Sequence, residues 1–266
     1  MPQFGLGLNA DADNLDPFVV QYVYPTFIAL AWCNAIDLII LCLNTFKRYA
    51  GSYFWSLFLA SLSIIPFGLG YLLKMFGISF SHYFFEILIS DISWAALVTG
   101  QSLVLWSRLH LVLRNRYILR GLLYLIIFDG VLLHTSSTAL ELATNALPHN
   151  QSFTLAFDIM ERIQLVWFCL QEMLISSLYV YATIKMLNLD ACSFSRGILI
   201  QLIGVNFIIM ALDMSVVAVQ YSGLFTFQVT FKVLVYSIKL KLEYAILGRL
   251  VKVAHIRTQI DINTSL

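Results

Sequence analysis

Long apolar runs alternate with short polar segments along almost the whole chain. A helix needs roughly 20 apolar residues to cross a hydrocarbon core of about 30 Å. Runs of that length occur at residues 23–45, 53–73, 83–107, 119–143, 162–187, 198–220 and 224–249. The pattern predicts an all-α protein, a polytopic transmembrane bundle of seven helices, with residues 1–266 forming a single transmembrane domain.

Composition supports the same class and excludes several others. The chain is 60% hydrophobic and 12% charged, whereas soluble domains are about 45–50% apolar and about 25% charged. Its five histidines and four cysteines are scattered, without the spacing of a metal site or a disulfide framework. It also has no glycine-rich phosphate loop. We therefore expect no metal, no cofactor and no nucleic-acid partner.

The basic residues predict how the chain crosses the membrane. Eleven of the 16 Lys and Arg residues follow odd-numbered spans, whereas the opposite side carries only Lys74 and Arg162. Because cytosolic loops are enriched in Lys and Arg, the N-terminus is expected to be lumenal or extracellular and the C-terminus cytosolic. Asn150 begins a glycosylation sequon on the predicted lumenal side. The segment 144–161 around it is expected to be a loop, either a connector or a lid.

Ionisable residues lie inside the predicted spans, where each costs roughly 2.5–3.5 kcal/mol on insertion scales. Five acids and two lysines are well inside: Asp37, Asp91, Asp129, Glu172, Asp213, Lys232 and Lys239. In the last span, Lys232, Tyr236, Lys239 and Glu243 share one helical stripe, which is expected to face the bundle interior.

Depth, counted at about 1.5 Å per residue, predicts two clusters of these groups. Asp91, Glu172, Asp213 and Lys232 fall nearer the lumenal side, whereas Asp37, Asp129 and Lys239 fall in the other half. One interpretation is that the groups join the helices through ion pairs and hydrogen bonds. The other interpretation is that some of these acids act as proton donors, because the acids outnumber the lysines. A carboxyl group without a cation in a low-dielectric interior is favoured in its neutral form, in which it can donate a proton.

Two stretches carry a family resemblance: TGQSLVLWSRLHLVLRNRYILR at 99–120 and YSIKLKLEYAIL at 236–247. They resemble a family of fungal seven-span integral membrane proteins, mostly uncharacterised, over about residues 18–251. Some members are similar to membrane-bound terpene cyclases of meroterpenoid biosynthesis. The resemblance implies secondary metabolism, a prenylated and epoxidised aromatic substrate, and a multi-pass location in the endoplasmic reticulum or another endomembrane.

The match does not extend to the small fungal cyclases of the paxilline and pyripyropene type. Those proteins carry Trp-Glu near the second span, whereas the second span here, FWSLFLASLSIIPFGLGYLL, has no acid. Their catalytic residues therefore cannot be transferred to this chain.

The residues permit a cyclisation that starts with protonation. An acid would protonate an epoxide or alkene, aromatic faces would stabilise the carbocation, and a base would remove the last proton. The candidate catalytic acids are Asp91, Glu172 and Asp213. The candidate substrate-binding residues are Trp94, Trp167, Phe168, Lys232, Tyr236 and Lys239. The expected partners are a lipophilic prenylated substrate and membrane lipid; no protein partner is indicated.

Two alternatives remain at this point. Seven spans, an outward N-terminus and a basic third loop are typical of a seven-helix receptor or sensor without enzymatic activity. Against this, Ser107-Arg108-Leu109 stands where known receptors carry Asp/Glu-Arg-Tyr, and no Asn-Pro-x-x-Tyr follows in the last span. A retinal protein or an ion transporter would use Lys232 or Lys239 with an acid nearby, although such pairs are commonly structural.

Overall fold

Every long apolar run of the sequence forms a helix. The computed structural model describes residues 22–45, 51–75, 83–113, 115–146, 151–189, 193–221 and 225–264. The helices are α2 (Tyr24–Thr45), α3 (Ser52–Met75), α4 (Tyr83–Val112), α5 (Arg116–Ala146), α6 (Gln151–Leu189), α7 (Ser193–Gln220) and α8 (Phe225–Thr264). The prediction of an all-α bundle of seven helices is confirmed for the described residues.

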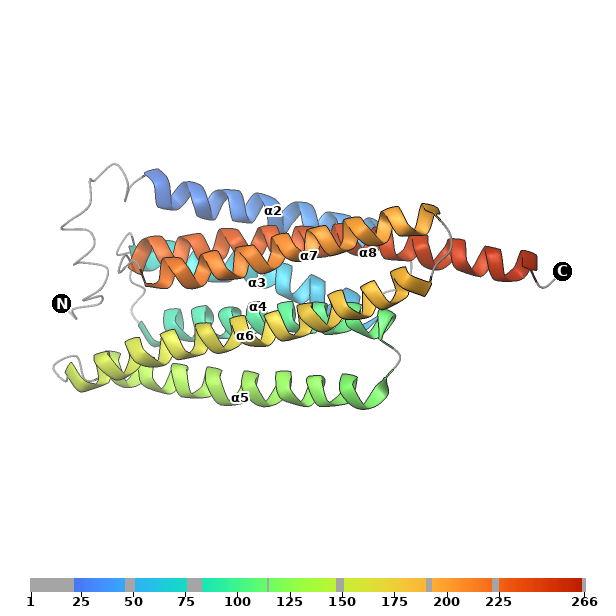
Figure 1. Ribbon diagram of the computed structural model, residues 1–266. Coiled ribbons are helices and arrows are strands. Elements are labelled where there is room, and N and C mark those ends of the chain that lie inside the picture. Colours follow the sequence, from blue (N-terminus) through green and yellow to red (C-terminus); the bar gives the residue numbers. More distant parts are fainter. Residues whose placement is uncertain are drawn as a thin grey trace.

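The helices lie side by side, each packed against its neighbours in sequence (Figure 1). In addition, α8 contacts α2 and α3, and α4 contacts α6, so that the first and last helices close the bundle. Large apolar side chains such as Phe128 and Ile92 are 65% exposed on its outside. Such a surface fits lipid rather than water. The start of α2 and the end of α8 lie at opposite ends of the bundle (Figure 1).

Six of the described helices, α2 to α7, contain stretches long and apolar enough to cross a membrane. The remaining helix, α8, carries too many charges for that criterion, yet it packs among the others, and three of its charged side chains face inward. Lys232 is 3% exposed, and both Lys239 and Glu243 are 0% exposed. The structure therefore supports a multi-pass membrane protein in which α8 is a polar, central helix. The orientation across the membrane stays a prediction.

The predicted loop 144–161 is wrong for most of its length. Helix α5 continues to Ala146 and α6 already begins at Gln151. The sequence from 151 to 161 contains neither Pro nor Gly, so nothing in it interrupts a helix, and hydropathy alone had placed the boundary too late. Asn150, the predicted glycosylation site, lies outside the described residues.

The contact between α3 and α4 is the most extensive in the bundle, and a glycine permits it. A Cβ atom added at Gly100 would lie 2.8 Å from the Cβ of Ala60 and 3.4 Å from its Cα. Because small residues let helix backbones approach closely in membranes, Gly100 and Ala60 set the spacing of these two helices. At Gly121 in α5, nothing lies within 4 Å of such an added atom.

This difference predicts opposite outcomes for one substitution at two positions. Gly100→Ala should destabilise the protein by about 1–3 kcal/mol, because the helices must separate. Gly121→Ala should be neutral or stabilising by up to about 1 kcal/mol, because it only raises helix propensity. Thermal unfolding of the purified protein in detergent measures both, and equal shifts of the melting temperature would contradict the close packing.

Candidate functional site

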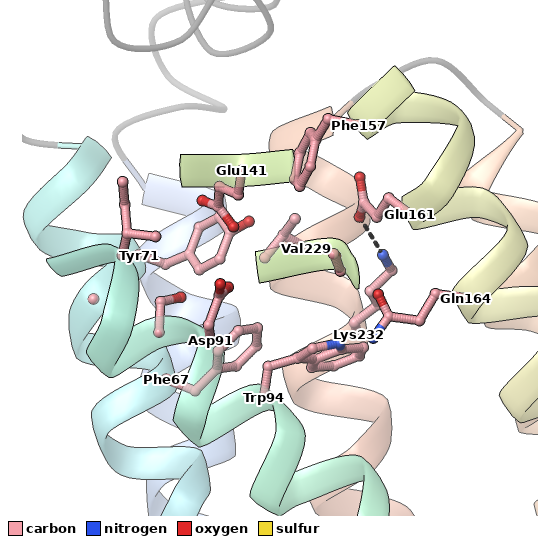
Figure 2. Close-up of a pocket in the computed structure, with 14 residues that line it drawn as sticks. Phe67, Tyr71, Asp91, Trp94, Glu141, Phe157, Glu161, Gln164, Val229 and Lys232 are labelled. Carbon is pink, nitrogen blue, oxygen red and sulfur yellow. Dashed lines mark hydrogen bonds and ion pairs between the residues drawn. The ribbon is translucent and has the colours of Figure 1, made fainter. Parts of the chain in front are cut away.

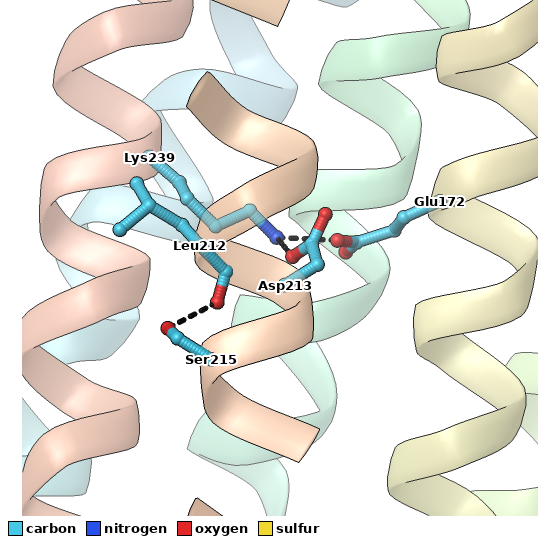
Figure 3. A network of polar contacts seen from close by, with 5 residues as sticks. All are labelled: Glu172, Leu212, Asp213, Ser215 and Lys239. Atoms are coloured by element: carbon cyan, nitrogen blue, oxygen red, sulfur yellow. Dashed lines mark hydrogen bonds and ion pairs between the residues drawn. The ribbon is translucent and has the colours of Figure 1, made fainter. Parts of the chain in front are cut away.

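Lys239 connects three helices in the middle of the bundle. Its Nζ lies between Glu172 Oε2 of α6 and Asp213 Oδ1 of α7, and donates a hydrogen bond to each (Figure 3). None of the three side chains is more than 5% exposed. Nζ also lies 4.7 Å from the centre of the Tyr236 ring. Two buried acids thus share one lysine, whose amino group also faces an aromatic ring.

A second buried ion pair lies four residues further along α8. Arg108 Nε of α4 is 2.8 Å from Glu243 Oε2, and both side chains are 0% exposed. Arg108 Nη2 donates a hydrogen bond to Asn206 Oδ1 at 3.3 Å, and the guanidinium lies 4.7 Å from the centre of the Tyr179 ring. The pair joins α4 to α8, with α6 and α7 supplying the remaining contacts.

The two clusters predicted from depth are regrouped in the structure. Lys239 meets Glu172 and Asp213 instead of Asp37 and Asp129. Asp37 Oδ2 is 3.2 Å from Lys241 Nζ at the outer side of α2 and α8. Counting residues from predicted span ends was misleading because α6 begins much earlier than expected and because helix tilt changes depth.

A polar cavity of about 80 Å³ lies at the end of the bundle where α2 begins (Figure 2). Three carboxyl groups and one amino group line it: Asp91, Glu141, Glu161 and Lys232. Lys232 Nζ is 2.9 Å from Glu161 Oε1, which also accepts a hydrogen bond of 3.0 Å from Gln228. With two more acids than cations, the cavity is acidic, and its volume holds several water molecules.

Aromatic side chains form much of the remaining wall of this cavity. Trp94 stacks on Phe67 with ring centres 5.3 Å apart and meets Tyr236 edge to face at 5.5 Å. Lys232 Nζ lies 5.7 Å from the centre of the Trp94 ring. Tyr71 and Phe157 complete the aromatic part of the lining. A cation or a carbocation inside the cavity would therefore face both carboxylates and π systems.

A larger and almost entirely apolar groove of about 390 Å³ lies between α4 and α5. Leu88, Ile92 and Ala95 of α4 face Ala139 and Leu142 of α5 across it, and its few polar groups include His134 and Asp91. Asp91 therefore lines both the groove and the polar cavity. Its buried Oδ2 has no hydrogen-bond partner among the described residues.

The structure brings some of the predicted site residues together and separates others. Asp91, Trp94 and Lys232 line the polar cavity, whereas Glu172, Asp213, Lys239 and Tyr236 form the central cluster. Phe168 is buried and stacks on His134, with ring centres 5.1 Å apart. Trp167 lies away from both groups, because its side chain is 48% exposed on the outside of the bundle.

Three residues with buried or cavity-lining side chains were not predicted from the sequence. Arg108 was counted as a loop cation, although its spacing of seven from Gln101 and fourteen from Trp94 places it on the inward stripe of α4. His134 was read as isolated, but it lies 2.9 Å from Gln164 through Nδ1 and 3.5 Å from Thr99 through Nε2. Glu141 lies near the end of α5, and nothing in the sequence at that position indicates that its side chain faces a cavity.

Comparisons with known proteins identify a family and no characterised relative. Residues 18–261 match the family described as a domain of unknown function, DUF7703, and the chain belongs to it. No curated protein and no solved structure matches the chain. Among the described residues, no group of three His, Cys, Asp or Glu side chains could hold a metal ion.

The central cluster predicts a large difference between two lysines. Lys239→Met should destabilise the protein by about 3–5 kcal/mol, because two carboxyl groups then remain buried without a cation. Lys185→Met is the matched control, because Lys185 lies exposed near the end of α6, and it should cost about 0.5 kcal/mol or less. Thermal unfolding in detergent measures both, and equal losses would contradict the assigned role of Lys239.

Proposed function

We propose that this member of the DUF7703 family is a membrane-bound cyclase of prenylated, epoxidised aromatic compounds, acting in fungal secondary metabolism. Its sequence resembles fungal membrane proteins of which some are similar to terpene cyclases of meroterpenoid biosynthesis. The resemblance supplies the substrate class, and the two cavities supply the place where such a substrate would bind.

The position of Asp91 carries the proposal. An isoprenoid chain partitions into the bilayer and fits an apolar groove open to the outside of the bundle. Asp91 lies at the junction of that groove with the polar cavity. A prenyl chain lying between α4 and α5 would place its epoxide end beside this carboxyl group. The aromatic wall formed by Trp94 and Phe67 lies next to it.

The proposed reaction is an isomerisation in which every proton is accounted for. The role requires Asp91 as the neutral carboxylic acid, which donates its proton to the epoxide oxygen while one C–O bond breaks. Alkene π electrons then attack the resulting carbocation and form ring bonds, and the cation moves along the chain past the aromatic faces. The last cation loses a proton to a carboxylate, and proton exchange through the polar cavity restores Asp91. The product has the mass of the substrate.

Glu172 and Asp213 suit this role less well than Asp91. Both accept hydrogen bonds from Lys239, so each acid already has one carboxyl oxygen engaged inside the bundle. Neither residue lines the polar cavity or the groove between α4 and α5. In the proposed enzyme they hold helices in place, and Asp91 is the proton donor.

A second candidate function rests on the acidity of the polar cavity. Three carboxyl groups against one amino group, with Trp94 and Tyr71 in the wall, suit a small organic cation held by charge and cation–π attraction. A seven-helix sensor would bind such a ligand without converting it. Product formation distinguishes this function from the cyclase.

The first test incubates microsomes containing the protein with farnesylated phenolic epoxides. The proposal predicts a product of unchanged mass and shifted chromatographic retention. Asp91→Asn should lower its formation by about 100-fold or more, the usual contribution of a general acid. The matched control is Asp129→Asn, because Asp129 also has a buried oxygen without a partner but lines neither cavity.

The outcome separates the two candidates when protein levels and membrane insertion are equal. Product formation by the Asp91→Asn variant at the rate of the unmodified protein would show that Asp91 is not the acid. Absence of conversion over several prenylated substrates, together with saturable binding of a small organic cation, would replace the cyclase by the sensor.

A further prediction concerns access from the bilayer. Ala139→Phe adds a phenyl ring to the groove between α4 and α5 and leaves the lining of the polar cavity unchanged. We expect KM for a long prenylated substrate to rise by about 10-fold or more, the cost of losing roughly 1.4 kcal/mol of binding. A short dimethylallyl analogue should be affected less. Equal effects on both substrates would contradict entry of the chain through this groove.

A further inference from the structure

Among the described residues, one ion pair faces outward. Lys241 Nζ of α8 is 3.2 Å from Asp37 Oδ2 of α2, and the side chains are 42% and 62% exposed. The same amino group donates a hydrogen bond of 3.2 Å to Asn34 Oδ1, and Asn34 Nδ2 donates one of 3.3 Å to Ser237. Apolar side chains surround this polar patch, among them Leu30, Ile36 and Leu41, which are 38–50% exposed.

The patch lies at a depth where lipid tails are expected. Asp37 is eight residues from the end of α2 at Thr45, a distance of about 12 Å along the helix. The long side chain of a lysine can extend toward the headgroups, but the short side chain of aspartate cannot cover that distance. An ionic pair facing hydrocarbon is costly, so charged groups at this depth normally face protein or water.

We propose that a second copy of this chain covers the patch. The patch carries one negative and one positive group side by side, so it is complementary to itself when a twofold axis turns one copy against another. Asp37 of each copy then faces Lys241 of the other, and Asn34 supplies further hydrogen bonds. Polar side chains of this kind join helices in membranes. The result is a homodimer that buries α2 and the neighbouring edge of α8, independently of any reaction at Asp91.

The dimer is tested first in the unmodified chain. Fluorescently tagged protein is placed in lipid vesicles at high dilution, and photobleaching steps are counted in single particles. Two steps in most particles are expected, and single steps throughout would overturn the proposal. The exposed Cys33 lies one helical turn from Asp37. In a chain carrying Cys169→Ser and Cys192→Ser, a short bismaleimide should give a dimer that Cys33→Ser removes.

Pairing between copies has a sharper test in two charge-reversed chains. Asp37→Lys places two lysines at the patch and Lys241→Asp places two aspartates there, so each variant alone should be monomeric. Expressed together under different tags, the two variants should copurify, because each lysine now meets an aspartate of the other chain. An internal role for the ion pair cannot produce this rescue. Variants that each dimerise like the unmodified chain, or that fail to copurify while the unmodified chain dimerises, would overturn the interface.

Discussion

The bundle depends on one lysine placed between two acids in its middle. Lys239 of α8 binds Glu172 of α6 and Asp213 of α7, with none of the side chains more than 5% exposed. Removing one partner of such a buried cluster leaves uncompensated charge and costs several kcal/mol. The cluster therefore fixes how α8 is rotated and how far it is shifted along its neighbours. It also explains how a helix as charged as α8 can occupy the centre of a membrane bundle.

The remaining polar contacts of α8 follow from this fixed position. Seven residues before Lys239, Lys232 faces the polar cavity and pairs with Glu161. Four residues after it, Glu243 pairs with Arg108. Lys241 lies off this stripe, and it accordingly reaches the outer side of the bundle, where Asp37 holds it. Among its described side chains, α8 thus supplies an inner row of charges and one outward charge, which separates the proposed reaction site from the proposed dimer interface.

The sequence predicted the helices far better than the partners of their charges. Apolar runs define seven helices, and the seven-residue repeat of Lys232 and Lys239 placed both on the inward stripe of α8. The pairing of acids with lysines depends on helix tilt and on how far helices distant in sequence are shifted along one another. Counting residues from the span ends gives neither quantity. The beginning of α6 was missed because residues 151–161 are polar enough to look like a loop although nothing in them stops a helix. Arg108 was missed because a cation next to a basic loop resembles the other loop cations.

The most direct test of the proposed site is to map where a prenyl chain binds. A farnesylated phenol carrying a photoreactive diazirine on its chain would be irradiated with the protein in vesicles, and the labelled peptides identified by mass spectrometry. Labelling is expected at residues 88–95 in α4 and 134–142 in α5, and excess farnesylated phenolic epoxide should suppress it. Labelling confined to other helices, or not suppressed by the competitor, would contradict a prenyl-binding groove beside Asp91.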